Sequence, residues 1–294
     1  MKALLSGIKR MEIHDGDGLR TTVFFKGCPL KCIWCHNPES ISFSKQLAYF
    51  KEKCISCNSC LSACKENIFS NRTSPFPTCS FCEDCANDCP TNALIVYGKE
   101  YELDELLTIV LQDESFFRNG QGGVTLSGGE CLSQPDFVIP FAKRLFEKGI
   151  SVNIDTCGFV KREIFERIFP FIDTFLYDIK AFDETLHTRL TGKSNALILQ
   201  NLQYLSDIGA KIEIRYPLVS GFNDCECRNI AKFLTSIRLT KIKVLQYHRF
   251  ASSRYEALGL ENTLPLATTS SDDIEKSIAI FKSYGLNAVN GMNI

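Results

Sequence analysis

The sequence predicts an α/β protein, a partial (β/α)6 barrel that carries an inserted cysteine-rich domain. From about residue 102 onward, strand-like runs alternate with amphipathic helical segments, which is typical of βαβ units in a parallel sheet. Polar residues recur directly after these strands, and a barrel-like sheet collects its site from many strand ends in this way. This favours a partial barrel over an open doubly wound sheet. Residues 50–96 break the alternation, so we expect 1–49 and 97–294 to form the barrel and 50–96 the insert.

The individual elements follow from periodicity and from turn residues. Residues 19–27 predict a buried strand that ends at the first cysteine. Phe137, Phe141 and Leu145 recur at helical spacing, and Ser271 with Glu275 suits a helix start. The expected order is a helix at 102–117, strand 124–127, helix 135–148, strand 150–155, helix 161–170, strand 174–180, helices 184–190 and 196–208, strand 211–219, helix 226–237, strand 241–247, helix 272–284 and strand 287–290.

Composition limits the classes of function. The chain has 294 residues, of which 45% are hydrophobic, and its 33 Lys and Arg balance 34 Asp and Glu for a net charge of −1. This balance argues against broad binding to nucleic acid or to an anionic membrane. The apolar run in residues 1–8 is too short for a signal peptide or a membrane span, so we expect a cytoplasmic protein. In that compartment thiols stay reduced, and clustered cysteines indicate metal rather than disulfides.

Eleven of the fifteen cysteines fall into three short runs. The first run, C-x3-C-x2-C, consists of Cys28, Cys32 and Cys35. The other two runs share the bacterial ferredoxin spacing C-x2-C-x2-C-x3-C and consist of Cys54, Cys57, Cys60 and Cys64, and of Cys79, Cys82, Cys85 and Cys89. A four-iron cluster held by three cysteines keeps one iron open to a ligand. The first run therefore predicts a site where chemistry takes place.

The two four-cysteine runs predict a ferredoxin-like insert with two clusters. In two-cluster ferredoxins the fourth cysteine of each run binds the other cluster. That rule assigns Cys89 to the cluster of Cys54, Cys57 and Cys60, and Cys64 to the cluster of Cys79, Cys82 and Cys85. Zinc is the alternative, because paired C-x2-C motifs also bind it, but two uninterrupted four-cysteine runs favour iron and sulfur. Whether such clusters transfer electrons or only hold the insert together stays open.

The first cysteine run, with Trp34 before its last cysteine, resembles the signature of the radical S-adenosylmethionine (SAM) superfamily. Further motifs narrow the resemblance. They are Phe24–Cys28, His36–Glu39, Ser127–Glu130, Asp155–Gly158, Asp178–Lys180, Arg215–Val219 and Gln246–Arg249. Together, and in this order along nearly the whole chain, they resemble the glycyl radical enzyme activating enzymes, in the subgroup that carries a two-cluster insert.

The resemblance implies three 4Fe–4S clusters, SAM and a monovalent cation as cofactors. It implies that Cys28, Cys32 and Cys35 hold the open, catalytic cluster. The implied contacts with SAM are Trp34 and His248 at the adenine, Ser127, Gly128, Gly129 and Glu130 at the amino group, Asp178 at the ribose, Lys180 at the carboxylate, and Arg215 in an acidic network, with Asp155 and Thr156 near the cation. Each polar residue also has a plainer explanation, such as an Asp178–Lys180 ion pair, a core histidine or a surface arginine.

The implied function is activation of a glycyl radical enzyme. SAM is cleaved reductively to a 5′-deoxyadenosyl radical, which takes a hydrogen atom from a glycine of the partner. Flavodoxin or ferredoxin supplies the electron under anaerobic conditions, and a monomer is expected. The alternatives are a radical SAM enzyme that acts directly on a small molecule or peptide, with the insert holding auxiliary clusters, and a non-catalytic electron carrier.

Two features fit the resemblance less well. The turn at Asp15 has Asp17 where the family has a proline, which costs rigidity and leaves the role of Asp15 undecided. The remaining thiols, Cys131, Cys157, Cys225 and Cys227, fit no metal set, so we expect them to be small buried residues or incidental thiols.

Overall fold

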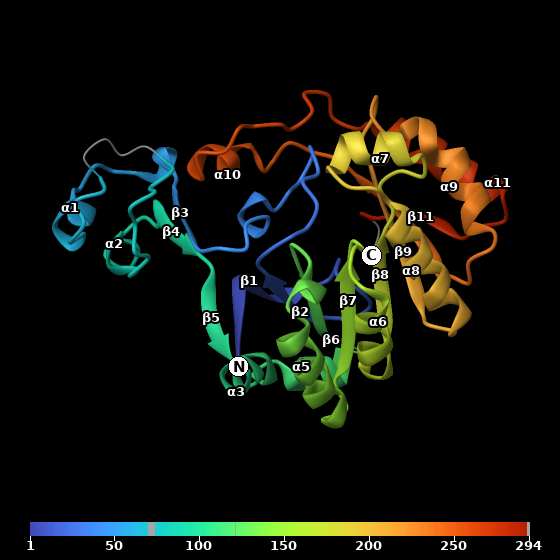
Figure 1. Ribbon diagram of the computed structural model, residues 1–294, viewed down its shortest axis with the longest axis horizontal. Coiled ribbons are helices and arrows are strands. Elements are labelled where there is room, and N and C mark those ends of the chain that lie inside the picture. Colours follow the sequence, from blue (N-terminus) through green and yellow to red (C-terminus); the bar gives the residue numbers. More distant parts are fainter. Residues whose placement is uncertain (70–73, 121, 293–294) are drawn as a thin grey trace.

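The computed structural model describes residues 1–69, 74–120 and 122–292. Its main feature is a nine-stranded sheet in the order β11-β10-β9-β8-β7-β6-β2-β1-β5 (Figure 1). The strands are β1 Lys2–Glu12, β2 Arg20–Phe25, β5 Lys99–Glu102, β6 Gly123–Gly128, β7 Ser151–Thr156, β8 Thr174–Asp178, β9 Ile212–Leu218, β10 Lys241–Gln246 and β11 Ala288–Asn290. From β2 to β11 all neighbours are parallel, whereas β1 pairs antiparallel with both β2 and β5. The predicted α/β class with a mostly parallel sheet is confirmed.

The helices outside the insert are α3 Leu103–Leu111, α4 Glu114–Gly120, α5 Pro135–Glu147, α6 Arg162–Ile168, α7 Glu184–Thr191, α8 Ala196–Asp207, α9 Cys227–Leu234, α10 Ser252–Ala257 and α11 Ser271–Ser283. Most of them pack against one face of the sheet in the main apolar core (Figure 1), whereas α7 and α10 pack in smaller clusters. In α11 the capping pair is Ser270 with Asp273 rather than Ser271 with Glu275. Among the described residues, no helix has both the length and the apolar character needed to cross a membrane.

Apolar and polar side chains alternate along each strand, which gives the sheet two different faces. Val124, Leu126 and their equivalents on the neighbouring strands pack against the helices in one large apolar core. Because successive side chains point to opposite sides of a strand, the residues between them face the other way. Those residues are polar, including Thr125 on β6, Asp155 on β7 and Arg215 on β9. The polar face therefore lies opposite the helices.

Several elements of the described structure were not expected from the sequence. Only Ala3 and Leu5 of β1 are fully buried, so this strand shows little of the alternation that marks a half-buried strand. Strands β3, β4 and β5 have four residues each, too few for a periodic signal. Helix α10 is also short, with six residues. The expected helix at 102–117 is two helices, α3 and α4, separated at Asp113, whose buried carboxylate binds Arg10 and Thr21.

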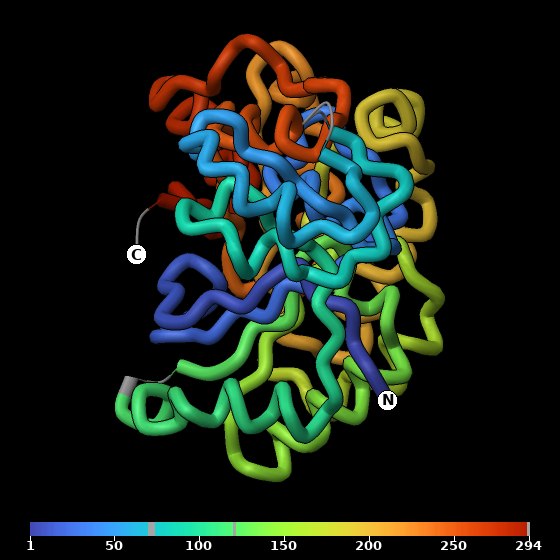
Figure 2. Tube along the Cα trace, turned by 90° about the vertical axis from the view of Figure 1, so that its left-hand side faces the viewer, coloured from blue at the N-terminus to red at the C-terminus, as the bar shows by residue number. Residues whose placement is uncertain are grey.

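The cysteine-rich segment is bracketed by a small antiparallel sheet of β3 Gln46–Tyr49 and β4 Leu94–Tyr97. Between these strands lie the short helices α1 Ser59–Ala63 and α2 Asp84–Asn87, while residues 70–73 of the expected insert lie outside the described residues. A separate apolar cluster around Leu47, Phe69 and Phe76 packs against several cysteines. Figure 2 looks onto this segment, which contacts α10 through Phe50 and Leu258.

Candidate active site and cysteine-rich insert

The first cysteine run lies at the carboxyl end of the parallel sheet. It follows β2 directly, and the carboxyl ends of parallel strands meet at one edge of a sheet. Backbone bonds hold the loop from two sides: the amide of Cys28 donates to Ile41 O at 3.0 Å, and the amide of Ile33 donates to Leu190 O, at the end of α7, at 3.0 Å. The hydroxyl of Tyr255 on α10 donates to Cys35 O at 3.0 Å. The three cysteines are thus fixed by segments more than 150 residues apart in sequence.

The thiols of this loop lie in a buried environment. Burial raises the pKa of Cys32 to about 12, against the opposing charge of Lys180. Burial and the neighbouring thiol of Cys32 also raise the pKa of Cys35. Each thiol therefore influences the next, which places them around a common space. Binding a metal deprotonates such thiols outright, so the cationic charge of a metal centre offsets this cost.

Glu130 lies fully buried just after β6 and ties three strand ends together. Its Oε2 accepts hydrogen bonds from Thr156 Oγ1 at 2.8 Å and from the amide of Cys157 at 2.8 Å. Its own amide donates to Gly27 O, next to the first cysteine, at 2.8 Å. Burial raises the pKa of this carboxyl, and the donors from Cys157 and Thr156 act against that rise. The structure therefore gives Glu130 an organising contact with Thr156 that the sequence did not predict.

The glycines before Glu130 let these strand ends approach closely. Gly128 has a φ of +113°, a conformation that side-chain-bearing residues rarely adopt. A Cβ on Gly129 would lie 2.4 Å from Ser40 O and 2.5 Å from Gly27 O, far inside van der Waals contact. The expected close approach of backbone at this turn is thus an approach to the cysteine loop itself. A larger residue at either glycine would push the loop away from β6.

A second network joins Asp155 to Arg215 and to Asp15. The guanidinium of Arg215 lies 3.4 Å from Asp155 Oδ2 and 3.4 Å from Asp15 Oδ1, and it donates to His14 O at 2.9 Å. Ser127 Oγ donates to Asp155 Oδ2 at 2.7 Å. Burial raises the pKa of Asp155 to about 6, although the charge of Arg215 lowers it. Of the Arg215 nitrogens, Nε is buried without a hydrogen-bond partner among the described residues.

Asp178 and Lys180 form the ion pair that their spacing allows. Lys180 Nζ donates to Asp178 Oδ2 at 2.7 Å, with the two side chains 11% and 23% exposed. Burial by itself lowers the pKa of Lys180, but the charges of Asp178 and Cys32 outweigh it, and the pKa is raised well above its usual value. Lys180 is therefore a fixed positive charge beside the cysteine loop. It suits an anionic group bound there.

The two expected adenine contacts, Trp34 and His248, lie in one aromatic region. Trp34 is 5% exposed and packs in a cluster with Tyr247 and Tyr255. The ring of His248 stacks on that of His36, with centroids 4.2 Å apart and an interplanar angle of 15°. Burial lowers the pKa of His36 to about 4, so this ring is neutral at physiological pH. A flat apolar surface of this kind suits an aromatic base.

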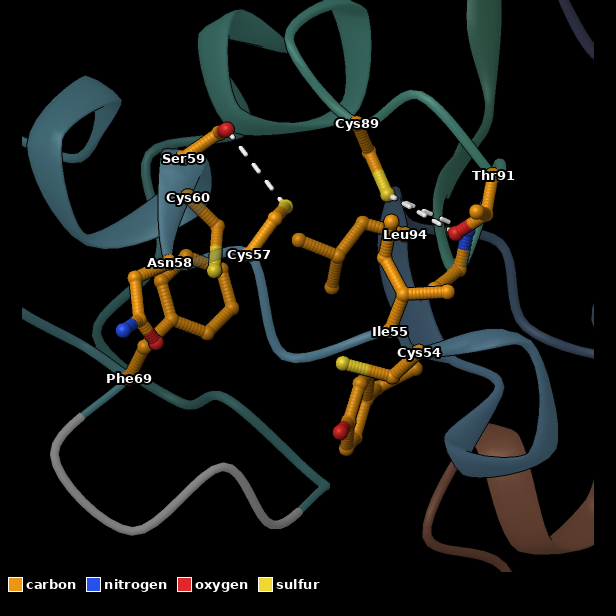
Figure 3. A pocket seen from close by; sticks show the side chains of 12 residues that line it. Cys54, Ile55, Cys57, Asn58, Ser59, Cys60, Phe69, Cys89, Thr91 and Leu94 are labelled. Atoms are coloured by element: carbon orange, nitrogen blue, oxygen red, sulfur yellow. Dashed lines mark hydrogen bonds between the residues drawn. The ribbon is translucent and has the colours of Figure 1, made fainter.

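In the insert, four cysteines line one pocket. They are Cys54, Cys57 and Cys60 of one run and Cys89 of the other (Figure 3). Figure 3 also shows Ser59 and Thr91 bonded to Cys57 and Cys89. The fourth cysteine of the third run thus lies with the first three cysteines of the second run.

The complementary set of cysteines gathers around Cys85. Burial raises the pKa of Cys85 to about 12, and the thiols of Cys79, Cys64 and Cys82 raise it further. Cys64 therefore lies near the cysteines of the third run. Among the described residues, no three His, Cys, Asp or Glu side chains converge closely enough to bind a single metal ion. An iron–sulfur cluster requires a wider arrangement, because its cysteines bind different irons.

Several contacts at this end of the sheet were not predicted from the sequence. Arg254 on α10 donates to Glu39 Oε1 at 2.8 Å and reaches Asn37, so a helix that was not predicted holds the segment after the cysteine loop. Lys26 is 1% exposed and donates to Gln46 Oε1 at 2.7 Å, which links β2 to the start of the insert. The available signal in the sequence was a lysine directly after the apolar residues of β2.

The fold and the site define an α/β enzyme whose buried thiols, acids and fixed cations meet at the carboxyl end of a mostly parallel sheet. Residues 22–234 match the model of the radical SAM superfamily. The trans-4-hydroxy-L-proline dehydratase activating enzyme of Clostridioides difficile is 39% identical over 88% of both chains. The choline trimethylamine-lyase activating enzyme of Oleidesulfovibrio alaskensis is 36% identical over 96% of both chains. The chain belongs to the radical SAM superfamily and, within it, to the glycyl radical enzyme activating enzymes.

A solved structure shares the fold at low sequence identity. The crystal structure of Streptococcus suis SuiB bound to its precursor peptide SuiA matches with a TM-score of 0.55 and 14% identity, over 90% of this chain and 46% of that chain. Superfamily membership implies one 4Fe–4S cluster and SAM, and the described cysteine, acid and cation contacts are consistent with both groups.

Proposed function

We propose that this chain cleaves SAM and uses the resulting radical to activate a glycyl radical enzyme. The observation that supports it most is the meeting of the first cysteine run with Glu130 and Lys180 at the carboxyl end of the sheet. When bound, the cluster and SAM supply the reductive cleavage that yields a 5′-deoxyadenosyl radical able to take hydrogen from a glycine. The chain itself binds and orients SAM and excludes water from the site.

In this proposal Cys28, Cys32 and Cys35 hold the cluster with the open iron. Lys180 neutralises the SAM carboxylate, and Asp178 both orients Lys180 and faces the ribose. The turn Ser127–Glu130 receives the SAM amino group through its backbone, since the carboxylate of Glu130 is already engaged by Thr156 and Cys157. Trp34 and His248 form the adenine surface, and Asp155 with Thr156 lies beside a monovalent cation.

The same proposal covers the architecture. The sheet forms a partial (β/α)6 barrel from residues 1–49 and 97–294, and residues 50–96 form a ferredoxin-like insert with two further 4Fe–4S clusters. The pocket lined by Cys54, Cys57, Cys60 and Cys89 supports the exchange of fourth cysteines between the two runs. Three clusters in total follow from this assignment.

The partner is a glycyl radical enzyme, and the reductant is flavodoxin or ferredoxin. We also propose that the protein is cytoplasmic and monomeric and that it binds neither nucleic acid nor membranes. The relatives named above activate a hydroxyproline dehydratase and a choline lyase, so these two partner classes are the first to test. A large reading frame next to the gene, ending in a glycine-bearing loop, would identify the class directly.

The decisive experiment uses the anaerobically reconstituted protein with dithionite and SAM. We expect 5′-deoxyadenosine to form with the native protein and not with the Cys28→Ala variant, because the variant lacks one of three cluster ligands. Adding the correct partner should then produce a glycyl radical signal in EPR spectra. Full cleavage by Cys28→Ala would refute the site, and a new small-molecule product without any partner would show an enzyme that acts on a small molecule instead.

A further inference from the structure

The ring of His36, to which the proposed function gives no role, lies in a column of aromatic side chains beside the catalytic cysteine loop. His36 follows Cys35 directly in the chain. Its ring is stacked with that of Tyr247, with centroids 5.6 Å apart and an interplanar angle of 22°, and with that of His248, at 4.2 Å and 15°. Tyr247 packs with Trp34 in one buried cluster. His36 therefore links the two expected adenine contacts, Trp34 and His248.

The column of Tyr247, His36, His248 and Phe250 ends at the surface of the protein. The ring of Phe250 is stacked with that of His248, with centroids 4.3 Å apart and an interplanar angle of 28°. Two rings at these distances cannot share one face of an imidazole, so His36 covers one face of His248 and Phe250 covers the other. Phe250 is itself 82% exposed. The ring of His248 therefore offers a ligand its edge rather than a face.

Backbone contacts determine which nitrogens of the two imidazoles carry a hydrogen. Nε2 of His36 lies 2.8 Å from the carbonyl oxygen of His248, and because a carbonyl oxygen only accepts, this nitrogen is the donor. The amide of Phe250 donates to Nδ1 of His248 at 3.4 Å. The hydrogen of the His248 ring is therefore on Nε2, since the bond made by one ring nitrogen sets the state of the other. The edge of His248 presents an N–H donor.

We propose that His36 is a positioning residue for the nucleoside half of SAM, which holds the His248 ring so that its Nε2–H donates to an acceptor of the bound nucleoside. The inference rests on the proposed function, because it takes His248 as a contact of SAM. The hydrogen bond from His36 fixes the backbone of His248 and the stack fixes its ring, so the donor is oriented before SAM binds. Adenine ring nitrogens and ribose hydroxyl oxygens are acceptors of this kind.

His187 on α7 provides a matched control within the same chain. It is 1% exposed, and its Nδ1 lies 2.7 Å from the carbonyl oxygen of Lys193, so it is also a buried histidine that donates to a backbone carbonyl. Among the ring contacts of the described residues, it takes no part in the aromatic column. His187→Gln therefore changes a buried histidine and its carbonyl contact without changing the column.

The first experiment separates the two halves of SAM. Equilibrium dialysis of the reconstituted holoenzyme measures the binding of 5′-deoxyadenosine and of methionine, and iron analysis checks that the variants are loaded equally. We expect His36→Ala to weaken the binding of 5′-deoxyadenosine about three- to tenfold and to leave that of methionine unchanged. His36→Phe keeps the stack and His36→Gln keeps a donor, so each should lose less. His187→Gln should change neither affinity.

Equal losses of affinity for the two ligands would overturn the inference, because His36 would then only support the cysteine loop that it follows. The Phe and Gln variants keep the test valid if His36→Ala takes up too little iron. In that case, an affinity for 5′-deoxyadenosine that is unchanged in both variants would overturn the inference as well.

The second experiment asks whether His36 acts through His248. His248→Ala should weaken the binding of 5′-deoxyadenosine, and the double variant His36→Ala with His248→Ala should bind it no more weakly than His248→Ala alone. Losses that add in the double variant would overturn the inference. Unchanged binding by His248→Ala would instead remove His248 from the SAM site and contradict the proposed function, so the two failures are distinguishable.

Discussion

At the scale of single residues, the site depends on charges that are buried together and satisfied by one another. Arg215 is 9% exposed and pairs with two carboxylates, Asp15 and Asp155, which lie far apart in the sequence. Burying a guanidinium without partners lowers the stability of the fold. Removing one that is already paired also lowers it, because the carboxylates are then left buried without a counter-charge. The same holds for Lys180 and Asp178. These pairs set the electrostatic character of the site before any ligand enters.

Replacing Arg215 by methionine should therefore destabilise the fold markedly. The variant leaves Asp15 and Asp155 facing each other without a cation, and we expect a loss of about 3–5 kcal/mol in the free energy of unfolding, measured in urea. Arg189→Met is the control, because Arg189 is an exposed residue on α7, and its effect should stay within about 0.5 kcal/mol. Equal effects of the two substitutions would contradict the assignment.

At the scale of elements, the antiparallel strand β1 is attached to the parallel sheet by side chains as well as by its ladder. Asp113, between α3 and α4, accepts hydrogen bonds from Arg10 Nε on β1 at 2.8 Å and from Thr21 Oγ1 on β2 at 2.6 Å. The carboxylate is 1% exposed. One buried residue thus joins two strands to the helical layer and ends α3 where a longer helix was expected.

Asp113→Asn should destabilise the protein by about 1–3 kcal/mol at pH 7, since a buried acceptor of charge-assisted bonds is lost. The hydrogen bond from Arg10 lowers the pKa of Asp113, so this contribution is complete above the ordinary carboxyl pKa of about 3.9. It is lost as the pH falls from there through the lowered value in the folded state.

Urea unfolding of the metal-free protein at pH 7 and at pH 3 tests this sign, because it keeps the acid lability of clusters out of the measurement. The difference between native protein and Asp113→Asn should shrink on acidification. The exposed Asp104, which pairs with Arg144 at 3.2 Å, provides the control variant Asp104→Asn, with an effect within about 0.5 kcal/mol at either pH. A difference that grows at low pH would show that the sign is wrong.

At the scale of the whole molecule, the insert is connected to the rest of the chain through strands β3 and β4 and through helix α10. Strands β3 and β4 lead into and out of it, and Ser74 Oγ donates to Ala257 O on α10 at 2.7 Å. The same helix contacts the catalytic cysteine loop through Tyr255 and Arg254. Helix α10 therefore contacts both cysteine-rich regions. A structural change in the insert that moves α10 would also affect the catalytic loop.

Two double variants test how the insert is built. With exchanged fourth cysteines, Cys54→Ala combined with Cys89→Ala removes ligands from one cluster and should leave the other insert cluster intact. Cys54→Ala combined with Cys64→Ala removes ligands from both. Iron and sulfide analysis should therefore show the loss of one cluster in the first variant and of two in the second. The opposite order would mean that each run holds its own cluster.

Much of this protein could be inferred from spacing along the chain. Three cysteine runs, the glycine turn before Glu130 and the pair Asp178 and Lys180, two residues apart at the end of β8, are local patterns. Such patterns can be read directly from the sequence. The sequence also determined the alternation of strands and helices, because the apolar face of each element repeats with its own period. Short elements such as β3 and α10 carried too few residues to show any period.

Only the tertiary structure decided which distant residues meet. It brought Arg215 to Asp15, separated by 200 positions, and it engaged the Glu130 carboxylate with Thr156. The reason is physical: contacts between strand ends depend on sheet order and register, which pairing across the whole sheet sets and no single segment encodes.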